Sequence, residues 1–158
     1  MSSILERRIV RCPYHLAQRY LADSVESAAA SAEPSPLTLT LAVPGGELVK
    51  NVIVTFAPGV DPMHFDQPWR IHWRPQAGPY PEFDGELTVR ADETYETARL
   101  ELSGSYRPPG GAVGAAFDWA VGGRIAAATA QALLERLAEA MESRYAGDEK
   151  AKESSASS

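Results

Sequence analysis

Two aspartates and a histidine stand close together in one proline-rich stretch between Pro58 and Pro68, and these are residue types that bind metals. They are Asp61, His64 and Asp66. A protein metal site needs three or four ligands in a defined geometry, held by further hydrogen bonds around them. Three side chains in a proline-rich loop fall short of that, and aspartate beside proline is typical of turns. We therefore predict no metal site here.

The single cysteine is the other residue that suggests chemistry. Cys12 follows Arg11, and a nearby positive charge lowers the pKa of a thiol and makes it more reactive. No histidine or aspartate partner for it is evident: His15 lies early in a predicted helix, and His72 alternates with tryptophans, which places it on a solvated face. The sequence also lacks a phosphate-binding loop, a dinucleotide-binding glycine motif, a nucleophile elbow and a C-x-x-C pair. We predict no catalytic residue set and no cofactor.

Apolar and aromatic side chains give a clearer pattern, because they alternate with polar ones along several short segments. The clearest is Trp-Arg-Ile-His-Trp-Arg at 69–74. The apolar side chains that share one face of these segments are candidates for lining a ligand cavity, together with residues of the last helix. The candidate lining residues are Trp69, Ile71, Trp73, Phe83, Leu87, Leu100, Leu102, Tyr106, Phe117, Val121 and Ile125. The alternative is that these side chains simply fill a core.

These side chains must be positioned by strands and helices, and the period of the pattern predicts which. Alternation with a period of two predicts strands at 4–10, 37–43, 48–57, 69–74, 83–90 and 97–107. Such alternation is typical of an antiparallel sheet with one dry face and one wet face. Helical spacing predicts a helix from Tyr14 to about Ala32 and a long helix from Ala112 to Tyr145.

The long helix carries an apolar stripe and is interrupted by two glycines. The stripe consists of Val113, Phe117, Val121, Ile125, Ala128 and Ala132, continued by Leu134, Leu137, Met141 and Tyr145. Gly122 and Gly123 each cost about 1 kcal/mol relative to alanine inside a helix. One explanation is that a ligand approaches closely or that the helix bends at a cavity mouth. The other is a break between two helices, or close packing on the sheet.

Composition limits the class of protein. With 158 residues the chain fits one domain, which we place at residues 1–145, followed by a disordered tail at 146–158 that has nothing to bury. The net charge of −6 argues against a nucleic-acid partner. No apolar run reaches the ~20 residues that span a bilayer. One cysteine and no signal-peptide pattern favour a cytoplasmic location.

The C-terminal part of the sequence resembles the START-like, or helix-grip, superfamily of polyketide cyclases, lipid-transfer domains and plant hormone receptors. The resemblance is carried by Leu-Glu-Leu-Ser-Gly-Ser-Tyr-Arg-Pro-Pro-Gly-Gly at 100–111, by Ala-Val-Gly-Ala-Ala-Phe-Asp at 112–118 and by Gly-Arg-Ile-Ala at 123–126. It implies an α+β helix-grip fold, in which a curved antiparallel sheet wraps around the long helix. We count six strands where that family usually has seven, and the first helical segment is shorter than its usual helix pair.

The resemblance also implies a function, which is to hold an apolar or aromatic ligand in a cavity between sheet and helix. Our first hypothesis is a non-catalytic small-molecule binding protein. The second is a cyclase-like or hydratase-like enzyme in the same fold, for which Tyr106 and Asp118 are the best-placed acid or base groups. The third is a structural or partner-binding module with a filled core. The sequence leaves the ligand and the oligomeric state open.

Overall fold

The structure is a computed structural model that describes residues 2–29, 36–43, 45–58, 68–78, 80–107 and 122–156. Its elements follow the order β1 (Ser2–Val10), α1 (Tyr14–Ala29), β2 (Leu37–Val43), β3 (Gly46–Pro58), β4 (Trp69–Pro75), β5 (Glu82–Ala91), β6 (Ala98–Arg107) and α3 (Gly123–Ala156). The described part is therefore α+β, with all six predicted strands present.

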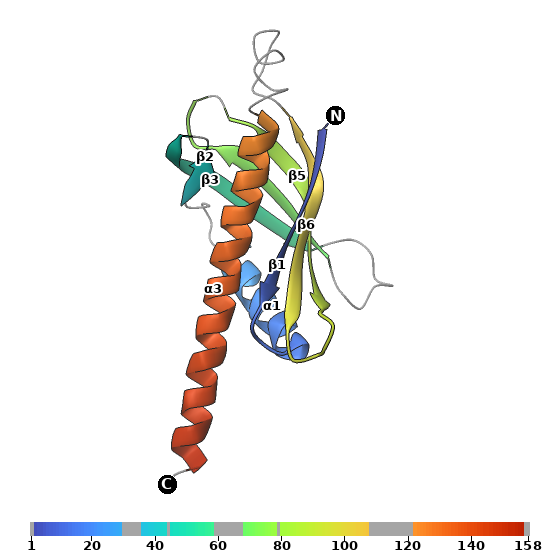
Figure 1. Ribbon diagram of the computed structural model, residues 1–158, viewed down its shortest axis with the longest axis vertical. Coiled ribbons are helices and arrows are strands. Elements are labelled where there is room, and N and C mark those ends of the chain that lie inside the picture. Colours follow the sequence, from blue (N-terminus) through green and yellow to red (C-terminus); the bar gives the residue numbers. More distant parts are fainter. Residues whose placement is uncertain are drawn as a thin grey trace.

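The six strands form one antiparallel sheet with the order β1-β6-β5-β4-β3-β2. The first strand lies at one edge beside the last strand, and the remaining neighbours follow the chain as a meander. The sheet is curled, and α3 runs along its concave side, with α1 near one end of the sheet (Figure 1). This is the predicted helix-grip arrangement of a curved sheet around a long C-terminal helix.

Alternation along the strands gives the sheet one buried face, as predicted. On β4, Ile71 and Trp73 are buried while Arg70 and Arg74 are exposed. Cross-strand register keeps the buried side chains together, because Trp73 pairs with Phe83, which in turn pairs with Tyr106 on β6. A one-residue slip of any strand would turn its apolar side chains to solvent.

Two glycines face each other on the neighbouring strands β5 and β6. Gly85 and Gly104 are directly opposite each other in the register. A Cβ atom at Gly85 would come 2.5 Å from the ring of Phe83 and would overlap the carbonyl oxygen of Ser103. The Phe83 ring thus occupies the space that side chains at these two positions would take. Glycines in strands commonly mark such close approach.

The stripe that α3 buries differs in part from the predicted one. The buried residues are Ala126, Thr129, Ala130, Leu133, Leu134, Ala138 and Met141. Of the predicted stripe, Ile125, Ala128 and Ala132 are only half-buried and pack at its flank. Small alanines therefore form much of the contact line, which lets the helix backbone approach the sheet closely. A search for large apolar residues misses them.

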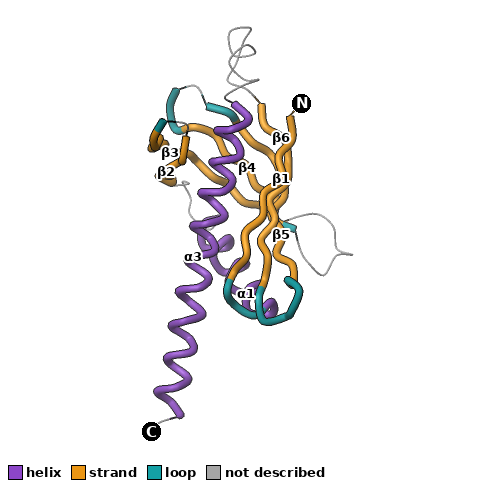
Figure 2. The backbone as a smooth tube through the Cα atoms, viewed as in Figure 1, coloured by secondary structure: helices purple, strands orange, loops and turns teal. Residues whose placement is uncertain are grey.

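The two ends of α3 also differ from the sequence prediction. The helix continues beyond Tyr145 to Ala156, through the segment predicted as a disordered tail, and extends past the sheet (Figure 2). An established helix gains one hydrogen bond for each residue added. The extension is also held to α1, because the hydroxyl of Tyr20 donates to Asp148 Oδ2 at 2.7 Å. The predicted first turns, from Ala112 to Val121, lie outside the described residues, as do residues 30–32 of the first predicted helix.

Candidate functional site

The inner face of the sheet carries a stacked pair of aromatic rings. The rings of Trp73 and Phe83 are fully buried, with centroids 4.1 Å apart and planes at 16°. Trp73 also donates a hydrogen bond from Nε1 to the carbonyl oxygen of Pro81 at 3.2 Å. Offset stacking of this kind adds to the energy of burial. The pair forms part of the buried core on the inner face of the sheet.

Most of the predicted lining residues come together on this inner face. Seven of them are buried in one core, namely Ile71, Trp73, Phe83, Leu87, Leu100, Leu102 and Tyr106. Trp69 and Ile125 are half-buried and pack against the same core. Phe117 and Val121 lie outside the described residues, as does Asp118. The structure thus gathers the nine described residues, while their role as ligand contacts remains a prediction.

Tyr106 supplies a polar group at this face. Its side chain is only 7% exposed, and within the part of the chain that the structure describes its hydroxyl makes no hydrogen bond. A Cβ atom at Gly123 would come 2.9 Å from this hydroxyl oxygen. Gly123 is therefore explained by close packing of the helix start on a sheet side chain, one of the two alternatives that the sequence left open.

A buried pair of hydroxyl groups joins the segment before β5 to α3. The hydroxyl groups of Tyr80 and Thr129 form a short hydrogen bond, and Thr129 Oγ1 also donates to the carbonyl oxygen of Ile125 at 2.7 Å. Burial raises the pKa of Tyr80, while the hydrogen bond to Thr129 acts in the opposite direction. The ammonium group of Lys50 lies 5.6 Å from the centre of the Tyr80 ring. Sequence reasoning missed this pair, because the two residues are 49 positions apart.

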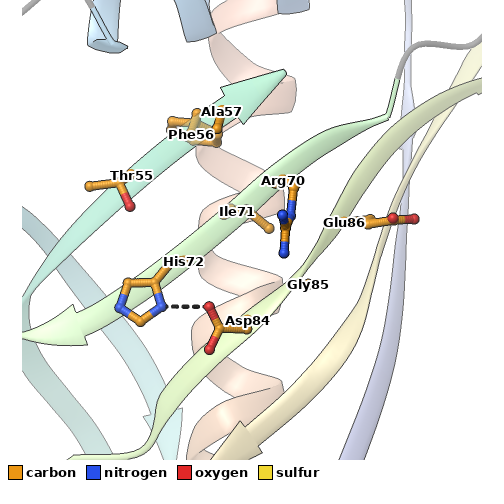
Figure 3. A pocket seen from close by; sticks show the side chains of 9 residues that line it. All are labelled: Thr55, Phe56, Ala57, Arg70, Ile71, His72, Asp84, Gly85 and Glu86. Atoms are coloured by element: carbon orange, nitrogen blue, oxygen red, sulfur yellow. Dashed lines mark hydrogen bonds and ion pairs between the residues drawn. The ribbon is translucent and has the colours of Figure 1, made fainter. Parts of the chain in front are cut away.

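The outer face of the sheet bears a groove of about 520 Å³, lined by Thr55, Phe56, Ala57, Arg70, Ile71, His72, Asp84, Gly85 and Glu86. In Figure 3 the side chains of His72 and Asp84 point toward each other, with α3 behind the strands. His72 Nδ1 lies 2.8 Å from Asp84 Oδ1, and Arg107 donates to the other carboxylate oxygen of Asp84 at 3.3 Å. His72 lies on the solvated face as predicted, but its partner Asp84 was not anticipated.

The structure corrects the view that positive charge activates Cys12. The thiol is buried, and burial together with the nearby carboxylate of Glu142 raises its pKa to about 11. Glu142 is held there because its Oε1 accepts a hydrogen bond from the backbone N–H of Arg11 at 3.2 Å. Cys12 is therefore an inert core thiol at neutral pH.

Groups of ligands for a metal ion are not found in the described ranges, where no three histidine, cysteine, aspartate or glutamate side chains converge. Asp61, His64 and Asp66 lie outside those ranges. Of the two described helices, neither is long and apolar enough to cross a membrane.

The sheet order, the curl and the long helix along the concave face together define a helix-grip fold. Among solved structures, the chain is similar to TTHA0849 from Thermus thermophilus, with a TM-score of 0.53 and 11% sequence identity over 90% of this chain and 99% of that one. At this identity the likeness concerns the fold alone. No protein-family model matches the sequence, and no curated protein matches it significantly.

Proposed function

We propose that this protein is a START-like binding protein that holds a small apolar or aromatic molecule between the curled sheet and α3, without catalysing a reaction on it. The observation that carries the proposal is Tyr106, whose side chain is nearly buried and whose hydroxyl has no hydrogen-bond partner among the described residues. A ligand oxygen that pairs with this hydroxyl would add a hydrogen bond, which is worth about 0.5–1.5 kcal/mol.

The surroundings of Tyr106 favour a flat ligand. Its direct cross-strand neighbour is Phe83, which stacks on Trp73 and offers an aromatic wall. Ligand pockets are mostly apolar with a few polar groups that fix orientation, which matches one hydroxyl among aromatic rings. The competing effect is close packing of the core, which would leave the ligand no room.

The proposal also covers the setting in which the protein works. A net charge of −6 disfavours binding to nucleic acid, whose phosphates repel an acidic protein. The single cysteine is compatible with the reducing cytoplasm, where we place the protein.

The test is a titration with a neutral fluorophore, such as a naphthyl ketone, whose emission changes when it leaves water. We expect one saturable site in the native protein. Leu102→Trp, on the inner face, should abolish binding while circular dichroism stays native. Ile125→Trp gives a second variant, because Ile125 is half-buried and a larger ring there need not overpack the core.

Three results would count against the proposal. They are the absence of saturable binding, binding that persists in both tryptophan variants, and unfolding of Leu102→Trp with unchanged binding in Ile125→Trp. The last combination is what a full core would give, because overpacking destabilises a filled interior. The structural role would then replace the binding role.

A further inference from the structure

The groove on the outer face of the sheet is formed by residues of the three neighbouring strands β3, β4 and β5. Thr55, His72 and Asp84 lie side by side on the neighbouring strands β3, β4 and β5. Two residues along β4 on the same face, Arg70 lies opposite Glu86 of β5. The groove has a volume of about 520 Å³, within the range of ~300–1,000 Å³ in which proteins hold small molecules. It is separated from the inner face by the sheet itself.

The negative charge of Asp84 is already compensated. One carboxylate oxygen of Asp84 faces His72 Nδ1 at 2.8 Å, and the other accepts a hydrogen bond from Arg107 at 3.3 Å. Two cationic or donor groups therefore engage this one acid. The Asp84 carboxylate contributes little net repulsion to an anion that enters the groove.

Arg70 is the cation of the groove that stays uncompensated. Among the described residues it forms no ion pair, and Glu86, which stands opposite it in the register and also lines the groove, forms none either. In Figure 3 the Arg70 side chain extends over the groove toward Gly85, while the Glu86 side chain, which also lines the groove, points in another direction. A guanidinium group is well suited to a carboxylate or phosphate, because its planar fork can donate two parallel hydrogen bonds.

His72 adds a donor or acceptor in a fixed direction. A carboxylate oxygen can only accept, so His72 Nδ1 carries the hydrogen that faces Asp84. The ring is therefore held in one orientation. Its Nε2 atom accepts a hydrogen bond in the neutral ring and donates one when the ring is protonated. The hydroxyl group of Thr55 lines the same groove on the neighbouring strand.

We propose that this outer groove is a second binding site, which takes a small organic anion carrying a carboxylate or phosphate group. The anionic group binds the Arg70 guanidinium and the Thr55 hydroxyl, and His72 Nε2 donates to it when the imidazole carries hydrogens on both nitrogens. Ala57, an exposed residue of β3, lines the groove and offers apolar contact to the organic part. This site is independent of the proposed ligand between sheet and helix, because it lies on the opposite face.

The test uses two probes, benzoate and phenyl phosphate, titrated by calorimetry or by NMR shifts against the full chain. We expect saturable binding of at least one, and the comparison shows which anion the site prefers. Arg70→Gln should weaken binding roughly ten-fold or more, because a charge-assisted hydrogen bond is lost. Arg74→Gln is the matched control: Arg74 is also exposed and on the same strand and face, but does not line the groove.

The control variant should change the affinity by less than about two-fold, since an exposed charge at a distance is screened. His72→Gln should weaken binding as well, and Ile125→Trp on the inner side should leave it unchanged. If neither probe binds saturably, or if Arg74→Gln weakens binding as much as Arg70→Gln does, the proposal is wrong. Loss of benzoate binding in Ile125→Trp would place the anion on the inner face and would also overturn it.

Discussion

The hydroxyl oxygen of Tyr106 lies against Gly123, so close that a methyl group at position 123 would come 2.9 Å from it. The contact joins the end of β6 to the start of α3. It explains why a glycine stands at a helix start where alanine would be the better helix former. It also places the hydroxyl beside the first residue of α3.

This contact predicts an interaction between two substitutions. Gly123→Ala should destabilise the wild-type protein by about 1 kcal/mol, because the new methyl group presses on the Tyr106 hydroxyl. In a Tyr106→Phe background the same change should be neutral or stabilising by up to about 1 kcal/mol, since only the gain in helix propensity remains. Urea denaturation of the four proteins gives the coupling energy. An equal effect in both backgrounds would show that the contact is not tight.

The glycine pair in the sheet predicts a larger loss. Gly85→Ala should cost about 3 kcal/mol or more, because the new methyl group meets the Ser103 carbonyl oxygen and not only the movable Phe83 ring. Gly147→Ala is the control, because nothing lies within 4 Å of a Cβ there, and it should stabilise the helix by up to about 1 kcal/mol. Thermal unfolding measures both. A Gly85→Ala protein as stable as the wild type would contradict the described strand geometry.

Much of the fold could be predicted from sequence because it depends on local pattern. Alternation at 69–74 alone assigns Ile71 and Trp73 to the buried face. The His72–Asp84 pair could not be predicted, because it depends on the register between β4 and β5, which no local pattern fixes. The contact between Tyr80 and Thr129 requires knowing how the helix lies on the sheet. The helical extension past Tyr145 does not follow from the local pattern, because it depends on the contact between Tyr20 and Asp148, 128 positions apart.

Stability should fall in alkali because two buried acids resist ionisation in the folded state. Burial, then Glu142, raises the pKa of Cys12 from 9.0 to about 11. Burial, then the hydrogen bond to Asp148, raises the pKa of Tyr20 from 10.0 to about 12. A group with a raised folded-state pKa contributes its full stability below the unfolded-state pKa and loses it as the pH rises to the folded-state value.

The free energy of unfolding should therefore decline between about pH 9 and pH 12. The decline should be shallower in Cys12→Ala combined with Tyr20→Phe, which lacks both groups. Denaturation in urea at several pH values measures the two slopes. Identical slopes in the two proteins would mean that these groups ionise as easily folded as unfolded.

Replacing apolar side chains of α3 by alanine should lower the free energy of unfolding by different amounts at different positions. Leu134 is 1% exposed, so Leu134→Ala should cost roughly 2–5 kcal/mol through lost contacts and the cavity left behind. Ile125 is half-buried, and Ile125→Ala should cost only about 1 kcal/mol. Chemical denaturation checks the order. A loss at Ile125 as large as that at Leu134 would show that Ile125 is buried in the core, as the predicted stripe had it.

The most direct test of the binding role is the effect of Tyr106→Phe on the affinity for the neutral naphthyl ketone. The substitution keeps the ring and removes only the hydroxyl, so the core stays filled. If the ligand binds between sheet and α3 and pairs with Tyr106, the dissociation constant should rise about five-fold to ten-fold, as expected for the loss of one hydrogen bond. Arg70→Gln, on the outer face, should leave it unchanged. An affinity that is insensitive to Tyr106→Phe but reduced by Arg70→Gln would contradict this account and place the ligand in the outer groove.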